Sequence, residues 1–159
     1  MKTDESSLKE ISYRGGLVRF RVPANWREEY PPDGGACFYE DVADSGTLRL
    51  ETITATSPTS ITAADSPRVL ADISRATSAE SIEVMPSGYA LSRYCQCPIE
   101  RGQELHVAYW SIAQVVPSSK IRVATFSYTL LAGQEHEPRF QEELRLVDAE
   151  VRKSTFWPE

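Results

Sequence analysis

Three long runs of β-forming residues, at 89–99, 105–116 and 121–131, constrain the fold of this chain more than any other feature. Five residues join the first two runs and four residues join the second pair. Connections this short favour antiparallel neighbours, because a parallel pair needs a crossover connection of about a dozen residues or more. The sequence therefore predicts an antiparallel three-strand meander.

The two connections also suggest a register for this meander. If the first connection is centred on Gly102, Cys95 lies opposite Tyr109. If the second turns at residues 118–119, Tyr109 lies opposite Tyr128. A slip of one residue exchanges the two faces of a strand, so this register decides which side chains are expected in the core.

Under this register the two faces of the meander differ in polarity. One face is mainly apolar and includes Arg93, opposite Ser111. The other face is mixed and still holds Tyr94, Trp110 and Ile112. Because a sheet with apolar residues on both faces needs cover on both, helices or a partner are expected on each side.

The rest of the chain supplies further strands and two helices. Alternating polarity predicts strands at 17–22 and 47–56, with a short strand at 37–40. Ser66 before Pro67 predicts the start of a helix that extends to about Ala76. A longer amphipathic helix begins at Pro138, and four apolar residues share one of its faces: Phe140, Leu144, Val147 and Val151.

These elements predict an α+β fold in which helices pack on the faces of an antiparallel β-sheet. A length of 159 residues fits one domain, so residues 1–159 are expected to form a single α+β domain. Residues 1–10 are polar at their start and are a candidate disordered N-terminus. The aromatic tail at 155–159 is expected to pack back on the domain.

Charge and targeting signals narrow the classes of partner. The chain carries 17 Lys and Arg against 23 Asp and Glu, a net charge of −6. This balance argues against binding nucleic acid or a membrane surface, because both attract basic proteins. The polar start offers no secretory signal and no apolar run is long enough to span a bilayer. With an odd number of cysteines, these features predict a cytoplasmic protein.

The three cysteines and two histidines do not form a recognised ligand pattern. Cys95 and Cys97 share one face of a strand, which is poor spacing for a disulfide. A metal site would need Cys37, His106 or His136 as well, and no second close pair of ligands accompanies them. The sequence therefore predicts no metal site, and the cysteines are expected in the core.

Catalytic patterns are also missing from the sequence. Neither His106 nor His136 has a nucleophile motif beside it, and the Glu142–Glu143 pair suggests a solvated helix surface. The two Gly-Gly pairs lack the spacing of a phosphate-binding loop. We therefore predict no catalytic residues and no cofactor.

Two features have both a structural and a functional interpretation. Trp26 and Tyr30 lie in a Pro-rich segment at 23–36, where they are candidates for binding a partner or for capping the core. Arg93 on the apolar face is either paired within the protein or directed at a ligand, so Arg93 and Trp110 are the candidate ligand-pocket residues.

The order of elements and one short motif resemble the PsbP-like superfamily. The motif is Phe-Arg-Val-Pro-Ala-Asn-Trp at 20–26, followed by Gly34-Gly35 and by Ser-Gly-Thr-Leu-Arg-Leu at 45–50. The superfamily includes photosystem PsbP proteins, DcrB-type lipoproteins and type VI effector-associated chaperones. The resemblance implies an αβα sandwich that binds other proteins, and it assigns no site residue.

Three functions remain open from the sequence. The first is a non-enzymatic soluble protein-binding domain, adaptor or chaperone. The second is a small-molecule-binding domain or an unrecognised enzyme, with a pocket near Arg93 and Trp110. The third is a homo-oligomer in which a sister chain covers the second face of the sheet.

Overall fold

A long antiparallel hairpin forms the centre of the protein, here described from a computed structural model that places residues 7–74, 81–85, 88–116 and 119–156. Its strands are β9 (Gln103–Val116) and β10 (Lys120–Leu131). Strand β7 (Ala90–Gln96) pairs antiparallel with β9 on the other side. The predicted meander is therefore confirmed.

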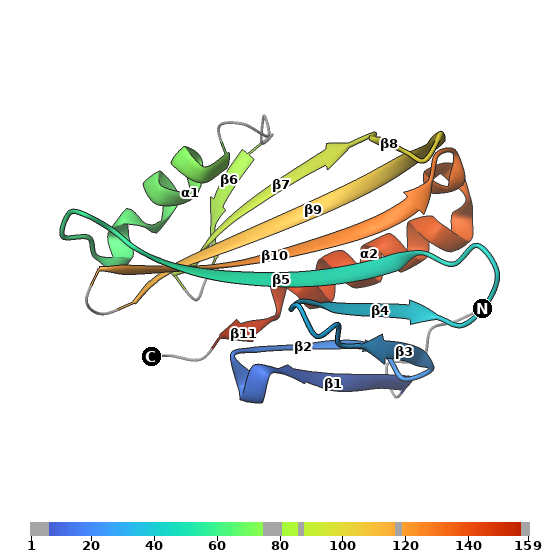
Figure 1. Ribbon diagram of the computed structural model, residues 1–159, viewed down its shortest axis with the longest axis horizontal. Coiled ribbons are helices and arrows are strands. Elements are labelled where there is room, and N and C mark those ends of the chain that lie inside the picture. The colour runs from blue at the N-terminus through green and yellow to red at the C-terminus, as the bar shows by residue number, and fades with distance from the viewer. Residues whose placement is uncertain (1–6, 75–80, 86–87, 117–118, 157–159) are drawn as a thin grey trace.

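This meander belongs to an eight-stranded antiparallel sheet (Figure 1). The strands run in the order β3-β4-β5-β10-β9-β7-β6, and β8 pairs separately with β9. The additional strands are β3 (Trp26–Glu29), β4 (Ala36–Glu40), β5 (Thr47–Thr56), β6 (Ser81–Val84) and β8 (Ile99–Glu100). The Pro-rich segment at 23–36, from which a loop would be expected, thus contains strand β3.

A second sheet has three antiparallel strands in the order β1-β2-β11. They are β1 (Leu8–Tyr13), β2 (Val18–Pro23) and β11 (Thr155–Phe156). The prediction of disorder over residues 1–10 is wrong for Leu8 to Glu10, which lie in β1, while residues 1–6 lie outside the described residues. Phe156 is buried, so this part of the aromatic tail does pack back on the domain.

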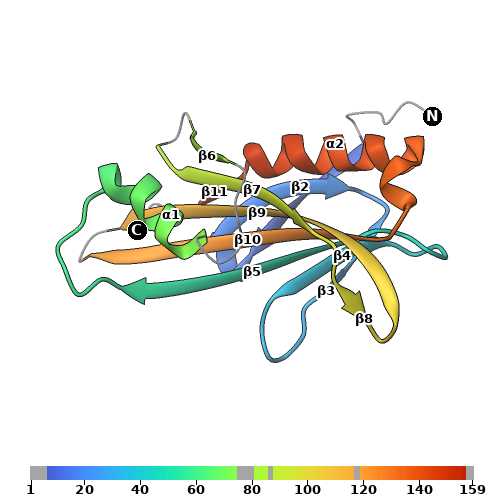
Figure 2. The same ribbon diagram turned by 90° about the horizontal axis from the view of Figure 1, so that it is seen from above.

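Two helices accompany the sheets (Figures 1 and 2). Helix α1 (Ser66–Ser74) follows a short 3-10 turn at Ala63–Asp65, and its start agrees with the prediction. Helix α2 (Pro138–Arg152) also begins where predicted. A 3-10 turn at Gln134–His136 precedes α2, and another at Arg14–Gly16 joins β1 to β2. No helix among the described residues is long and apolar enough to cross a membrane.

The main core lies between the large sheet, the small sheet and α2. Phe140, Val147 and Val151 of α2 are each less than 5% exposed. They belong to one cluster with Phe20 of the small sheet and Trp110 of the large one. Burial of these apolar side chains is the main source of stability, at roughly 1.5–3 kcal/mol each.

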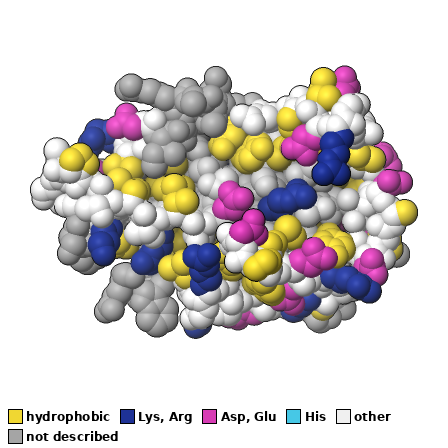
Figure 3. All heavy atoms as spheres, viewed as in Figure 1, with side chains coloured by type: hydrophobic (Ala, Val, Ile, Leu, Met, Phe, Trp, Pro, Cys, Tyr) yellow, Lys and Arg dark blue, Asp and Glu magenta, His cyan; other side chains and the backbone are white. Residues whose placement is uncertain are grey.

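The opposite face of the large sheet carries a smaller cluster. Leu70 of α1 packs there with Ala90, Ala113 and Val123. Beyond α1 this face is mixed in character. In the view of Figure 3, hydrophobic side chains form separate groups with charged side chains between them.

The register of the meander differs by one residue from the predicted one. Cys95 lies opposite Ala108 rather than Tyr109, and Tyr128 also lies opposite Ala108. The faces of β9 are therefore exchanged relative to the prediction, and Trp110 points into the main core with no exposed surface. Both faces of β9 are apolar, so its own pattern could not decide between them.

Candidate functional site

A cleft lies between α2 and the β2–β3 turn. Its volume is about 1060 Å³. It is lined by Ser7, Pro23, Ala24, Asn25, Trp26, Glu40, Pro138, Arg139, Gln141, Glu142, Glu143, Arg145 and Leu146. Because these residues are far apart in the sequence, the cleft depends on how the two sheets and α2 pack together. We call it the α2 cleft.

The amphipathic pattern of α2 determines which side chains face the α2 cleft. Phe140 and Val147 point into the core, and this orientation turns the neighbouring helix face outward. That face brings Arg139, Arg145 and Leu146 to the cleft. One wall is therefore a helix face that carries both charged and apolar side chains.

The opposite wall is the segment with the two aromatic candidates. Trp26 lines the α2 cleft, although it is only 3% exposed and belongs to the core cluster. Lys9 donates a hydrogen bond from Nζ to the Trp26 carbonyl at 2.6 Å, which ties β3 to β1. Trp26 thus caps the core, and its burial argues against a freely exposed binding side chain.

Tyr30 differs from Trp26 in its exposure. It is 53% exposed, and its ring packs edge-on against Phe38 with a centroid distance of 6.2 Å. Its hydroxyl donates a hydrogen bond to Glu28 Oε1 at 2.6 Å. Burial and this hydrogen bond raise the pKa of Tyr30 above its ordinary value. The hydroxyl therefore stays neutral, and Tyr30 remains available for surface contact.

A phenol–carboxylate pair lies beside the α2 cleft. The hydroxyl of Tyr128 on β10 donates a hydrogen bond to Glu143 Oε1 at 2.5 Å, and Glu143 lines the cleft. Tyr128 has no exposed surface, whereas Glu143 is half-buried. The interpretation of Glu142–Glu143 as fully solvated is therefore wrong for Glu143.

Gly46 makes room for this pair. A Cβ atom at Gly46 would clash with the Tyr128 hydroxyl and with Cζ of the same ring. Real Cβ atoms essentially never come this close to another atom, so a side chain at position 46 would require the Tyr128 ring to shift. The absence of a side chain at Gly46 therefore leaves the space in which the Tyr128 hydroxyl meets Glu143.

Burial and charge both favour the neutral form of this pair. Burial raises the pKa of Glu143, and the negative charge of Glu40 adds to the effect. The hydrogen bond from Tyr128 and the nearby Arg139 act in the opposite direction without reversing it. Burial also raises the pKa of Tyr128, and the negative charge of Glu143 is the second-largest cause of that rise. Such a carboxyl can accept or release a proton nearer neutral pH than an ordinary glutamate.

The structure brings Arg93 and Trp110 together, and neither residue lines the α2 cleft. The Arg93 guanidinium lies 4.6 Å from the centre of the Trp110 ring, a cation–π contact. Arg93 Nη1 also donates hydrogen bonds to the Tyr94 carbonyl at 3.0 Å and to Cys95 Sγ at 3.2 Å. Trp110 Nε1 donates to Asp148 Oδ1 at 2.8 Å. Both side chains are thus engaged within the protein.

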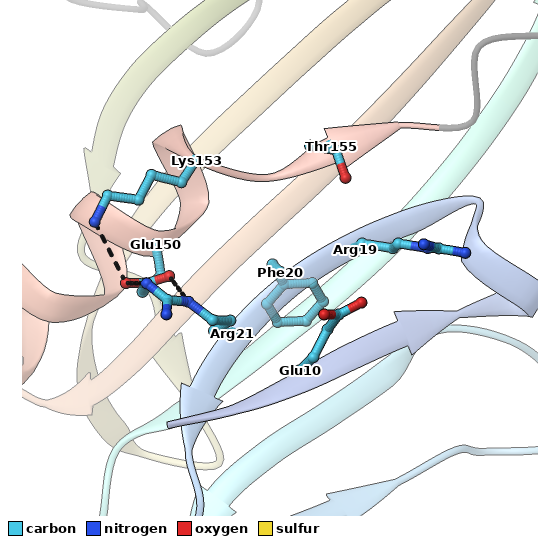
Figure 4. A pocket seen from close by; sticks show the side chains of 7 residues that line it. All are labelled: Glu10, Arg19, Phe20, Arg21, Glu150, Lys153 and Thr155. Carbon is cyan, nitrogen blue, oxygen red and sulfur yellow. Dashed lines mark hydrogen bonds and ion pairs between the residues drawn. The ribbon is translucent and has the colours of Figure 1, made fainter. Parts of the chain in front are cut away.

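A smaller hollow of about 320 Å³ lies where the end of α2 meets the small sheet (Figure 4). Arg21 reaches from β2 to Glu150 and donates two hydrogen bonds of 3.0 Å, from Nε and Nη2. Lys153 Nζ lies 3.8 Å from Glu150 Oε1. Glu150 is only 5% exposed, so this bidentate pair satisfies a buried carboxylate and fastens α2 to β2. We call this contact the Arg21–Glu150 clamp.

The cysteines and histidines do not make a metal centre. Cys95 and Cys97 are exposed, which contradicts the expectation that they are in the core. Cys97 Sγ lies 3.9 Å from His106 Nδ1, and Glu135 Oε1 lies 4.0 Å from the same nitrogen. Among the described residues no group of three or more His, Cys, Asp and Glu side chains could hold a metal ion.

Comparison with known proteins gives evidence about the fold only. No family model matches the chain, and no curated protein matches it. A crystal structure of a protein from Bacteroides thetaiotaomicron VPI-5482 superposes with a TM-score of 0.62 at 16% sequence identity. The match covers 95% of this chain and 49% of the other, so the chain spans about half the length of that protein. At this identity the likeness shows a shared antiparallel α+β fold.

Proposed function

We propose that this chain is a cytoplasmic, non-enzymatic protein-binding domain that holds a segment of a partner protein in the α2 cleft. The proposal includes the finer fold assignment, an αβα sandwich of the PsbP-like type with α1 and α2 as its outer layers. The existence of the α2 cleft carries the proposal, and the resemblance noted in the sequence agrees with it.

The size and lining of the α2 cleft support a peptide segment as the occupant. Its volume of about 1060 Å³ lies at the upper end of the usual range for small ligands, roughly 300–1,000 Å³, and leaves room for a peptide segment. Pro23, Ala24 and Leu146 offer apolar contacts, and Arg139 and Glu142 offer charges of both signs. An extended segment with apolar side chains for the walls and charged side chains for the rim would satisfy this lining.

The alternative of a small ligand near Arg93 and Trp110 has less support. Trp110 has no exposed surface, and its ring nitrogen is already bonded to Asp148. Neither of the two hollows described above is lined by Arg93 or Trp110. A ligand there would have to displace contacts that the folded protein already makes.

A peptide-display experiment tests the proposal. A library of random dodecapeptides is selected against the whole protein, and the affinity of the enriched peptides is measured by fluorescence anisotropy. Leu146→Glu places a charge in the α2 cleft and is expected to weaken binding at least tenfold, about 1.4 kcal/mol. Ile99→Glu makes the same change at an exposed apolar residue outside the cleft and is the matched control.

The proposal predicts that the two variants differ in their affinity for the enriched peptides. Peptides that bind the wild type and Ile99→Glu equally, but Leu146→Glu at least tenfold more weakly, support the proposal. The proposal is overturned if no peptide is enriched, or if both variants bind like the wild type.

A further inference from the structure

Strand β5 has one edge that is only partly covered. Along its inner edge all ten residues from Thr47 to Thr56 pair with β10. Along its outer edge β4 pairs only with Thr47 to Leu50. Residues 51–56 therefore have no strand on their outer edge within the described part of the chain. In Figure 1 this is the left half of β5, beyond the end of β4.

The backbone groups that point outward can be identified. A Cβ atom at Gly35 would lie 3.2 Å from the Leu50 carbonyl oxygen, so that carbonyl points toward β4. In a strand the N–H and C=O of every second residue point to the same side. The N–H and C=O groups of Thr52, Thr54 and Thr56 therefore point outward, and no hydrogen bond to them is found from any described residue on that edge.

The side chains of this segment do not protect the edge. Ile53 is 61% exposed, and residues 54–56 are exposed as well. Natural edge strands are usually blunted by Lys, Pro or a bulge, because an open edge pairs readily with another chain. The sequence Thr-Ile-Thr-Ala-Thr at 52–56 has neither Lys nor Pro and consists of small and β-branched residues. Such an edge favours strand addition.

We propose that the outer edge of β5 pairs antiparallel with the same edge of a second copy of this chain. A strand that pairs with itself about a two-fold axis makes a closed, self-complementary interface. In the proposed register Thr54 lies opposite Thr54 of the second copy, and Thr52 lies opposite Thr56. The eight-stranded sheets of the two copies thereby become one continuous sheet. This inference is independent of the α2 cleft.

Two constraints select this register. Ala36 of β4 already lies opposite Leu50, so the strand from the second copy must stay beside residues 51–56. Pairing centred on Thr54 places residues 52–56 beside residues 56–52 and meets this condition. It also keeps Glu51, the one charged residue of the segment, away from Glu51 of the second copy. This separation matters because like charges directly opposite each other destabilise a sheet.

The mass of the protein in solution tests the pairing. Light scattering and sedimentation are expected to show a dimer that dissociates on dilution. Thr54→Pro removes an outward N–H without breaking a hydrogen bond to β10, so this variant is expected to be monomeric. Thr54→Lys keeps the N–H and places two like charges together, which gives the same expectation if the proline variant does not fold. Thr54→Val is the matched control and should remain dimeric.

Cross-linking tests the register itself, in a background where Cys37, Cys95 and Cys97 are replaced by serine. Directly opposite residues of a hydrogen-bonded antiparallel pair have Cα atoms about 5.5 Å apart, within disulfide range. Thr54→Cys is expected to form a cross-linked dimer on oxidation, and Glu51→Cys is not. The proposal is overturned by a monomer at every concentration up to about 200 μM, or by a dimer that Thr54→Pro and Thr54→Lys leave intact.

Discussion

At the scale of single residues, Glu143 is a half-buried carboxyl of the α2 cleft whose pKa is raised by its surroundings. It accepts a hydrogen bond from the buried Tyr128, whose position depends on the missing side chain of Gly46. Perturbed carboxyl groups concentrate at functional sites, although structural pairs can also produce them. Because the pair is formed within one chain, its effect on stability can be measured without a partner.

The raised pKa of Glu143 makes a prediction about pH. The folded protein keeps the Glu143 proton to a higher pH than the unfolded chain, in which the pKa of this carboxyl has its ordinary value of 4.5. The contribution of Glu143 to the free energy of unfolding is therefore fully present below about pH 4.5 and is lost as the pH rises through the raised pKa. Relative to Glu143→Gln, the wild type is expected to lose stability over this range. Urea unfolding from pH 4 to pH 8 measures the difference.

Glu142→Gln is the matched control for this measurement. Glu142 is exposed on the same helix, and the difference between this variant and the wild type should change little with pH. A flat pH dependence for Glu143→Gln, or an increase in wild-type stability from pH 4.5 upward relative to that variant, would contradict the assignment.

At the scale of elements, helix α2 is held by two kinds of contact. Phe140, Val147 and Val151 bury an apolar stripe in the core. The Arg21–Glu150 clamp adds a directional contact to β2 near the C-terminal end of the helix. Since α2 forms one wall of the α2 cleft, both contacts also determine the shape of that cleft.

Breaking the clamp is predicted to destabilise the fold. Arg21→Met leaves the buried Glu150 carboxylate with only the longer contact to Lys153. Loss of the charged hydrogen bonds should cost about 2 kcal/mol, less than the roughly 3–5 kcal/mol of a fully buried pair, because the Arg21 side chain is itself 46% exposed. Chemical denaturation measures the loss. The control is Arg19→Met on the exposed face of the same strand, which should cost less than about 0.5 kcal/mol.

The elements with a strong local pattern were predictable from the sequence. The meander, β5 and both helices were found because each has a clear period or a helix-start signal. Strand β1 was missed because only Ile11 and Tyr13 mark its buried face. The register of β9 was wrong because both of its faces are apolar, and only the packing of Trp110 beneath α2 decides between them.

The candidate site was predictable only in part. The sequence marks Trp26 as a candidate for binding or capping, and its burial depends on core packing that the sequence does not show. The sequence does contain a signal for the burial of Glu143 and Glu150, namely their spacing from apolar residues of α2. Glu143 lies three residues after Phe140, and Glu150 lies three residues after Val147, so both fall beside the apolar stripe of α2. A carboxylate in that position is expected to be partly buried and to need a partner.

At the scale of the whole molecule, the α2 cleft and the open edge of β5 are separate surfaces. The cleft is formed where α2, β3 and the ends of β1 and β2 meet, and residues 51–56 are not among its lining residues. A dimer formed through β5 would therefore leave the α2 cleft available. Binding of a partner and pairing of two copies can be tested independently.

The most direct test of the central claim is an NMR titration of the isotope-labelled protein with a peptide enriched by display. We predict that the largest amide shifts occur at Ala24, Arg145 and Leu146, together with the indole signal of Trp26. Shifts confined to the open edge of β5 or to α1, with these four signals unchanged, would contradict the claim that the α2 cleft holds the partner.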